Sequence, residues 1–399
     1  MRAVIFFAAS LSCPASMRTE IIHGDLPSRH FEPRIYGVGA WTSHLHFAYD
    51  LVALLKPAIL VELGVDRGES YFGFCQSTLE NATGTQCFGV DTWRGDQHAG
   101  GYDETTFAQV SEHNRANYDS FSILIRSDFN EALNRFAEES IGVLHLDGLH
   151  TEDAIRHDVD AWLPKLRPGG ILLLHDVGVQ SKGFGVWKVW GELQQQGRSW
   201  TFHDGPGLGV WQKPPPTQLP GFLEELLAPP NESSAALATY YTERANALHE
   251  KIAQHWRDGS IRHTPFAQQT IIQVFYSSDG SHSEENSIYA RIGHEGWKEL
   301  QIELPPGAGA APLRIDFVSA LTTIEVAQIA VRAGDTNYFC ADDQSAFEAI
   351  AVRGDAERLP DEKLLRLKIT GIDPQLYLPA IVIAGTDGPR VLQMRLRVI

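Results

Sequence analysis

The chain has 399 residues, of which 43% are hydrophobic and 21% charged, so it is long enough for two globular domains with real cores. Its formal net charge of −17 argues against a general nucleic-acid-binding protein, which needs basic surface to displace counterions. None of the four cysteines forms a C-x-x-C pair, so neither a zinc cluster nor a disulfide framework is indicated. This pattern is typical of a reducing compartment.

The N-terminus has the outline of a short signal peptide, because Met1-Arg2 is followed by an apolar run, 3–11. That run is short, and Ser12-Cys13-Pro14 is a poor cleavage site. An untidy leader, or a true start at Met17, is the plainer interpretation. No later stretch reaches the roughly 20 apolar residues of a membrane helix. We therefore expect a cytoplasmic protein without a membrane span.

After an N-terminal arm, the apolar spacing of residues 44–55 predicts a helix that ends before Pro57. Apolar runs then predict strands that alternate with helical segments, which indicates an α/β fold with a parallel sheet. The first predicted strand is the apolar run 59–61, which ends in Glu62-Leu63-Gly64. The other predicted strands are 87–91, 121–125, 141–147 and 171–176, and the predicted helices are 71–79, 130–138 and 151–166. Residues 200–203 and 208–212 flank Gly205-Pro206-Gly207 and predict a closing hairpin.

A stiff, proline-rich connector, 214–220, ends this α/β region. A helix with a cap at Ser233 or Ser234 follows, and its apolar stripe fits packing on its own domain better than a small dimeric coil. The stripe comprises Leu237, Tyr241, Leu248, Ile252 and Trp256. Beyond residue 270, short β-rich runs separated by turn residues predict an all-β sandwich. These runs are 271–276, 287–292, 300–304, 313–317, 323–331, 364–369, 380–384 and 391–399.

The first predicted strand ends in Glu62-Leu-Gly64-x-x-x-Gly68-x-Ser70 and leads into a helix. A buried strand, a glycine-rich turn and a helix form the first unit of an α/β nucleotide site. The spacing differs from the Gly-x-Gly-x-x-Gly of dinucleotide enzymes. It resembles the first motif of class I S-adenosylmethionine (SAM) methyltransferases, most closely the catechol O-methyltransferase type. An ordinary strand–turn–helix is the alternative, since short motifs recur by chance.

The resemblance implies a Rossmann-like sheet of seven strands whose last strand is antiparallel. It divides the chain into an arm, 1–32, a methyltransferase domain, 33–213, a linker, 214–232, a connecting helix, 233–258, and a β-sandwich, 260–399. The segments Tyr289-Ala-Arg and Leu313-Arg-Ile-Asp316 resemble accessory sandwich modules of bacterial methyltransferases and glycosyltransferases that act on surface polysaccharides. A structural cap is the alternative role for this module.

Polar residues follow the predicted strands where ligands of open α/β sheets bind. Gly64 and Gly68 allow close approach of backbone to the cofactor, and Ser70 is placed to bind the methionine carboxylate. Glu62 either faces the methionine ammonium or merely caps the turn. The resemblance implies that Asp91 accepts hydrogen bonds from the ribose hydroxyls. It implies that Ser127 and Asp128 read the adenine edge, although both also fit a helix N-cap.

Two further strand ends carry Asp147-Gly-x-His150 and His175-Asp176. In metal-dependent O-methyltransferases, residues at the positions of Asp147, His175 and Asp176 bind Mg²⁺. His175 departs from that pattern, because Mg²⁺ prefers oxygen ligands. The arrangement is closer to the macrolide sugar O-methyltransferases, and this resemblance makes His150 the general base. Histidine suits the task because its ordinary pKa lies near working pH.

The loop 93–103 is polar and glycine-rich, as a substrate lid would be. Asp96, His98 and Tyr102 are candidates for acceptor binding, and an ordinary surface loop is the alternative. Lys182, Phe184 and Trp187 are weaker candidates of the same kind.

These observations favour a SAM-dependent O-methyltransferase that methylates a sugar hydroxyl of a surface polysaccharide or glycoside with the help of Mg²⁺. One alternative is a glycan-binding or assembly protein with a degenerate methyltransferase-like domain, because fold does not guarantee activity. A homodimer through the apolar stripe of the connecting helix is an alternative to a monomer for either function. A further alternative function is a metal-dependent hydrolase built on the Asp/His cluster. The cofactor motif together with Asp91 argues against the hydrolase.

Overall fold

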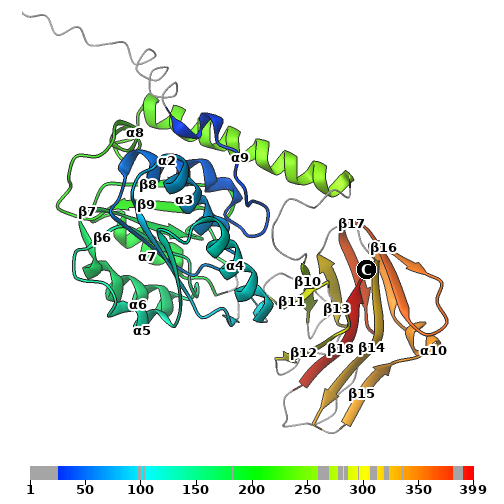
Figure 1. Ribbon diagram of the computed structural model, residues 1–399. Helices are drawn as coiled ribbons and strands as arrows, with labels where there is room; N and C mark the ends of the chain where they lie inside the picture. Colours follow the sequence, from blue (N-terminus) through cyan, green and yellow to red (C-terminus); the bar gives the residue numbers. More distant parts are fainter. Residues whose placement is uncertain are drawn as a thin grey trace, which may run out of the picture.

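The computed structural model describes most of the chain in two parts, an α/β domain and a C-terminal β-region (Figure 1). The described residues are 26–96, 100–101, 104–181, 183–258, 269–276, 282, 286–294, 296–305, 312–318, 323–334, 336–380 and 390–399. The predicted leader and the start at Met17 lie outside these ranges. Among the helices that the structure describes, none has the length and apolar character needed to cross a membrane.

The predicted Rossmann-like sheet is confirmed. Its seven strands follow the order β5-β2-β1-β6-β7-β9-β8. The strands are β1 Ile59–Leu63, β2 Gln86–Asp91, β5 Ser122–Arg126, β6 Ile141–Leu146, β7 Leu166–His175, β8 Ser199–Phe202 and β9 Leu208–Gln212. The pairs from β5 to β7 are parallel, whereas β9 runs antiparallel to both β7 and β8. Parallel strands place their carboxyl ends along one edge, so the polar strand ends share a rim.

Helices cover both faces of this sheet (Figure 1). One core cluster joins the sheet to α2 Leu45–Leu55 and α3 Glu69–Glu80, and the other joins it to α6 Glu152–Trp162 and α7 Val186–Leu193. The remaining elements of this domain are η1 Pro27–His30, η2 Thr42–His44, α4 Glu104–Asn117, α5 Phe129–Leu133 and η3 Leu163–Lys165. Helix α4 was not predicted, because its buried positions are few and mostly polar. The predicted helix 130–138 is longer than α5.

Helix α9, Glu232–Asp258, follows the short α8, Gly221–Leu226, and packs on the α/β domain (Figure 1). The predicted cap was wrong, because Asn231 Oδ1 accepts the bond from Ser234 N at 3.0 Å. Tyr241 on the apolar stripe donates to the buried carboxylate of Asp50 at 2.9 Å, and Ser28 donates to the same carboxylate at 2.6 Å. The stripe therefore packs on its own domain, as predicted. The side chain of Trp256 lies outside the description.

The C-terminal β-region, which we call the C-terminal β-domain (described residues within 269–399), surrounds a single apolar core. Its described strands form one continuous hydrogen-bonded order, β12-β18-β14-β17-β13-β10-β11, with β15 and β16 attached at the sides. An all-β domain is thus confirmed, whereas a sandwich of two separate sheets is not. The elements are β10 Gln269–Phe275, β11 Ser287–Gly293, β12 Lys298–Leu304, β13 Arg314–Val318, β14 Thr323–Ala333, β15 Thr336–Ala341, α10 Gln344–Phe347, β16 Ala351–Leu359, β17 Leu365–Tyr377 and β18 Arg390–Val398. Elements β15, α10 and β16 were not predicted, and nearly all of the predicted strand 380–384 lies outside the described residues.

Candidate active site

The polar strand ends meet at one rim and bond to each other through the backbone. Gly64 N donates to Val90 O at 2.9 Å, and Asp147 N donates to Leu63 O at 2.8 Å. Ser127 N donates to Asp91 O at 3.0 Å. The loops after β1, β2, β5 and β6 therefore begin as continuations of the sheet, which holds their side chains in register with one another.

The turn after β1 requires glycine at positions 64 and 68 because of its backbone conformation, and at position 64 also because of its close packing. Gly64 has a φ of 90° and Gly68 a φ of 79°, both in the left-handed region that favours glycine. A Cβ atom at Gly64 would lie 2.0 Å from the carbonyl oxygen of Asp147. The turn is thus in close contact with the loop after β6, which carries Asp147 and His150. Asp66, between the two glycines, also has a positive φ of 49°.

Asp91 lies at the end of β2, and its carboxylate holds the glycine turn. Its Oδ2 accepts from Val65 N at 2.9 Å and from Asp66 N at 3.0 Å, while Oδ1 accepts from Trp93 N at 2.7 Å. Burial raises the pKa of Asp91 in spite of these three bonds. A carboxylate offers about four acceptor positions, so room remains for a further donor such as a ribose hydroxyl. The predicted ribose contact stays a prediction.

Glu62 lies fully buried beneath the turn, in a row of polar side chains that was not predicted. Ser70 Oγ donates to Glu62 Oε1 at 2.6 Å, and Glu62 Oε2 lies 3.5 Å from His145 Nδ1. Trp41 Nε1 donates to His145 Nε2 at 3.2 Å, which leaves Nδ1 to carry the ring proton of a neutral His145 towards Glu62. Burial raises the pKa of Glu62. Glu62 is thus bonded to Ser70 at the end of the glycine turn, and its contact with the methionine ammonium stays a prediction.

Glu69, at the start of α3, ties the segment before α2 to the rim. Its Oε1 accepts from Gly37 N at 2.6 Å and its Oε2 from Trp41 N at 2.9 Å, and Thr42 Oγ1 also donates to Oε1. This segment is thereby held against the start of α3. Because the partners lie about thirty positions away, no local pattern indicates this role.

Asp128 is the N-cap of α5, since its Oδ1 accepts from Glu131 N at 2.9 Å. Ser127 Oγ donates to Asp128 O at 2.9 Å, and Ser127 is half-buried. The local, structural alternative therefore accounts for Asp128. A contact of either residue with adenine remains a prediction.

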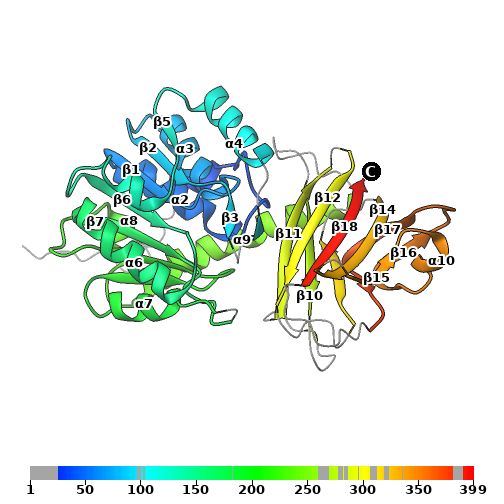
Figure 2. The same ribbon diagram turned by 90° about the horizontal axis from the view of Figure 1, so that it is seen from below.

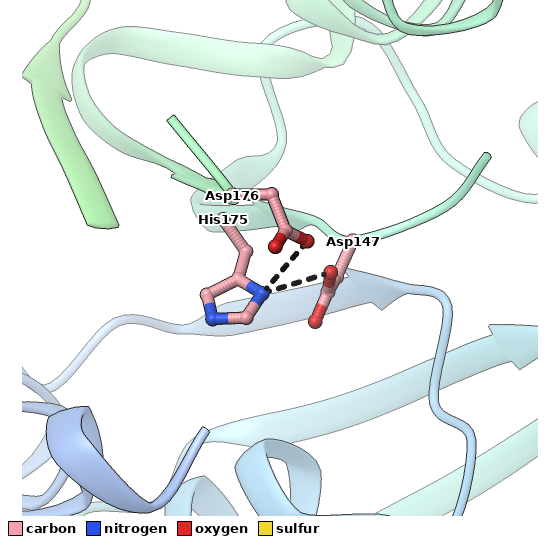
Figure 3. A group of neighbouring side chains, drawn as sticks. All are labelled: Asp147, His175 and Asp176. Atoms are coloured by element: carbon pink, nitrogen blue, oxygen red, sulfur yellow. Dashed lines mark hydrogen bonds and ion pairs between the residues drawn. The ribbon is translucent and has the colours of Figure 1, made fainter. Parts of the chain in front are cut away.

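The predicted metal ligands Asp147, His175 and Asp176 come together in one cluster (Figure 3). His175 Nδ1 lies 3.2 Å from Asp147 Oδ1 and 3.2 Å from Asp176 Oδ2. The three candidate ligand atoms all lie within 4.8 Å of one another. Two carboxylate oxygens and one imidazole nitrogen are a donor set that suits a divalent cation, and the nitrogen also admits transition metals.

His150 belongs to the same cluster. Its Nε2 lies 2.9 Å from Asp176 Oδ2 and 3.4 Å from Asp147 Oδ1. The imidazole stacks on Phe184, with 4.6 Å between the ring centroids and 3° between the planes. Phe184 thus positions the imidazole, and the Nε1 of Trp187 donates to the Phe184 carbonyl at 3.2 Å. Lys182, the third candidate of that segment, lies outside the described residues.

Groups of opposite charge preference face each other in this cluster. Burial lowers the pKa of His150, but Asp147 and Asp176 outweigh it and raise the pKa to about 10. Burial opposes charge on His175 too, yet the same carboxylates hold its pKa well above the usual value. Burial raises the pKa of both aspartates, but the two histidines outweigh it and keep both pKa values low. The two carboxylates thus favour positive charge on the two imidazoles, and a divalent cation would supply positive charge at the same place.

The predicted lid is only partly described. Asp96 ends the two-residue strand β3, Gly95–Asp96, which pairs with β4, Gly100–Gly101, but its side chain is not described. His98 and Tyr102 lie outside the described residues. Gly101 pairs with Ala290 of β11, so this hairpin is an edge of the C-terminal β-sheet, which was not expected.

Residues 61–177 match the family Methyltransf_24, described as "Methyltransferase domain". This segment, within a Rossmann-like α/β unit, is thus similar to a methyltransferase domain. The matched segment runs from β1 to just past Asp176, so it contains the glycine turn, Asp91 and the whole acidic cluster. The family thereby supports SAM as the methyl donor of this domain.

A protein of Sinorhizobium fredii (strain NBRC 101917 / NGR234), named "Uncharacterized protein y4gI", is 43% identical over 176 residues. The match spans 44% of this chain and 19% of that relative. A Geobacter sulfurreducens methyltransferase structure is 13% identical at a TM-score of 0.34, covering 52% of this chain and 91% of that one. A putative caffeoyl-CoA O-methyltransferase from Staphylococcus aureus is 13% identical at a TM-score of 0.35, covering 49% and 91%. Similarities to structures at such scores carry no argument about substrate.

Proposed function

We propose that this protein is a SAM-dependent O-methyltransferase that methylates a sugar hydroxyl of a surface polysaccharide or glycoside with the help of a divalent cation. The main support for the proposal is that the glycine turn of the predicted methyl-donor motif directly contacts Asp147, which belongs to the cluster with His150, His175 and Asp176. Gly64 has no room for a Cβ atom beside the Asp147 carbonyl, and Asp147 is also 3.4 Å from His150. Donor site and candidate base are therefore adjacent.

The chain's own groups account for binding of the donor. The backbone of the turn between Gly64 and Gly68 and the first N–H groups of α3 can bind the carboxylate of SAM, since a helix N-terminus favours anions. Glu62 supplies a buried negative charge for the ammonium group, and Ser70 orients it. Asp91 supports the turn and leaves an acceptor position for ribose.

Asp147, His175 and Asp176 would hold the cation, and its chemistry when bound is to lower the pKa of an acceptor hydroxyl. His150 takes the proton of that hydroxyl, the hydroxyl oxygen forms a bond to the methyl carbon, and the carbon–sulfur bond breaks to leave S-adenosylhomocysteine (SAH). Asp147 and Asp176 raise the pKa of His150 to about 10, and a bound cation would lower that pKa by compensating the charge of the two carboxylates. His150 can therefore act as the base only when a cation compensates the negative charges of Asp147 and Asp176.

Calorimetric titration of the full chain with SAM, alone and with Mg²⁺, tests the proposal. SAM binding by folded protein is the expected result, and its absence would overturn the proposal. Nucleotide sugars and surface-polysaccharide fragments are then screened for SAM-dependent methyl transfer. This second step identifies the acceptor, on which fewer observations bear than on the methyl donor.

A metal-dependent hydrolase is the second candidate, because the cluster of two aspartates and two histidines is also a hydrolytic donor set. It predicts metal binding without SAM binding. A glycan-binding protein with a degenerate methyltransferase domain predicts neither. The same titration series therefore separates the three functions.

A further inference from the structure

Two rim segments of the methyltransferase domain contact one strand of the C-terminal β-domain. Gly101 of the β3–β4 hairpin pairs with Ala290 of β11. The next residue, Arg291, places Nη1 3.3 Å and 3.4 Å from the two carboxylate oxygens of Asp66. Figure 2 shows β3 between the two domains, with β11 on the facing side. One strand thus holds both the hairpin and the turn of the cofactor motif.

Asp66 occupies a demanding position in that turn. It is the non-glycine residue with positive φ between Gly64 and Gly68, a conformation that L-residues rarely adopt. Its N–H donates to Asp91 Oδ2 at 3.0 Å, and its carbonyl accepts from Trp93 Nε1 at 2.9 Å. Any movement of Asp66 therefore disturbs Asp91 as well as the turn itself.

The carboxylate of Asp66 lies between two arginines from different domains. Arg67 Nε of the same turn is 3.7 Å from Oδ1, and Arg291 reaches it from β11. The Arg291 side chain is 14% exposed and that of Asp66 34% exposed, so the pair is partly shielded from solvent. Shielding strengthens an ion pair relative to one at the open surface.

We propose that Arg291 is a positioning residue for the cofactor turn, and that the C-terminal β-domain thereby contributes to SAM affinity. The proposal rests on the proposed function, since it concerns the same donor site. Arg291 limits the conformations of a strained turn before the cofactor arrives, and such preorganisation reduces the entropy cost of binding.

The test measures SAH binding by calorimetry on the full chain, together with thermal unfolding. Arg291→Gln is expected to weaken SAH binding about three- to tenfold with little change in the unfolding temperature. Arg291→Lys keeps the charge and is expected to retain part of the affinity. In an Asp66→Asn background, Arg291→Gln is expected to cause no further loss, because the pair is already broken.

Arg395→Gln is the matched control, since Arg395 pairs with Glu299 at 3.3 Å within the C-terminal β-domain. It should leave SAH affinity unchanged. If Arg291→Gln binds SAH as tightly as the wild type, the inference about Arg291 is overturned. The proposed function would still stand in that case, because the wild type binds SAH. An equal loss in the Asp66→Asn background would also overturn it, because the effect would then arise from general damage to the domain. No SAH binding by the wild type would instead overturn the proposed function.

Discussion

Nε2 of His150 lies 2.9 Å from Oδ2 of Asp176, in the same cluster whose carboxylates face His175. This contact gives His150 two possible states, an imidazolium paired with aspartate or a neutral base. The charge on the two aspartates decides between them. We therefore expect activity, metal binding and protonation to be coupled at His150.

Replacement of His150 tests its role as the base. His150→Ala is expected to lower turnover about 10²- to 10⁴-fold, the usual contribution of a general base. SAM affinity should stay nearly intact, because the cofactor contacts come from the loops after β1 and β2. His157→Ala, an exposed histidine on α6, is the control and should leave both quantities unchanged. Collapse of SAM binding in His150→Ala would show that His150 is structural.

Removal of one carboxylate tests the cation site. Asp147→Asn is expected to weaken Mn²⁺ or Mg²⁺ binding at least tenfold, because it removes one of the charged ligands from the cluster. Chelation of the wild type should abolish turnover, and added cation should restore it. Asp153→Asn, on the exposed surface of α6, serves as the control. Full activity after exhaustive chelation would contradict a role for the cation.

Asp91 is expected to affect the cofactor before it affects chemistry. Asp91→Ala removes the acceptor of three backbone N–H bonds that shape the glycine turn. SAM binding should weaken at least tenfold, whereas kcat at saturating SAM should fall less. The measurement is the dissociation constant for SAM beside a full kinetic profile. A fall in kcat with unchanged SAM affinity would contradict this assignment.

The Asp50 carboxyl makes folding stability depend on pH. Burial raises its pKa to about 6, although bonds from Ser28 and Tyr241 oppose this. The folded state therefore keeps a proton that the unfolded chain releases from about pH 4 upward. The stabilisation is complete below pH 4 and is lost as pH rises through about 6, with a total of up to about 3 kcal/mol.

Denaturant unfolding of the wild type and of Asp50→Asn checks this dependence. The difference in unfolding free energy between the two proteins should change between pH 4 and 6 and be flat above pH 7. The hydroxyls of Ser28 and Tyr241 can reverse their bonds to accept from the amide, so the variant should fold. A difference that is constant across the whole range would refute the raised pKa.

Local patterns in the sequence were enough to predict the α/β sheet and most of the rim. A glycine turn after a buried strand, and polar residues directly after apolar runs, report on neighbours within a few positions. Asp91, Asp147, His150, His175 and Asp176 all follow or end such strands, and parallel strands bring their ends to one edge. The helix α4 escaped prediction because its short buried side carries few apolar residues to show a helical period.

By itself, then, the sequence was enough to predict the donor motif and the cluster of Asp147, His150, His175 and Asp176, because both predictions rest on short-range spacing. Only the tertiary structure decided what supports them. Trp41 bonds to His145 over 104 positions, and Arg291 reaches Asp66 over 225. No periodicity links residues so far apart, since their contact depends on how the domains pack. The role of the C-terminal β-domain at the cofactor turn is therefore a property of the fold.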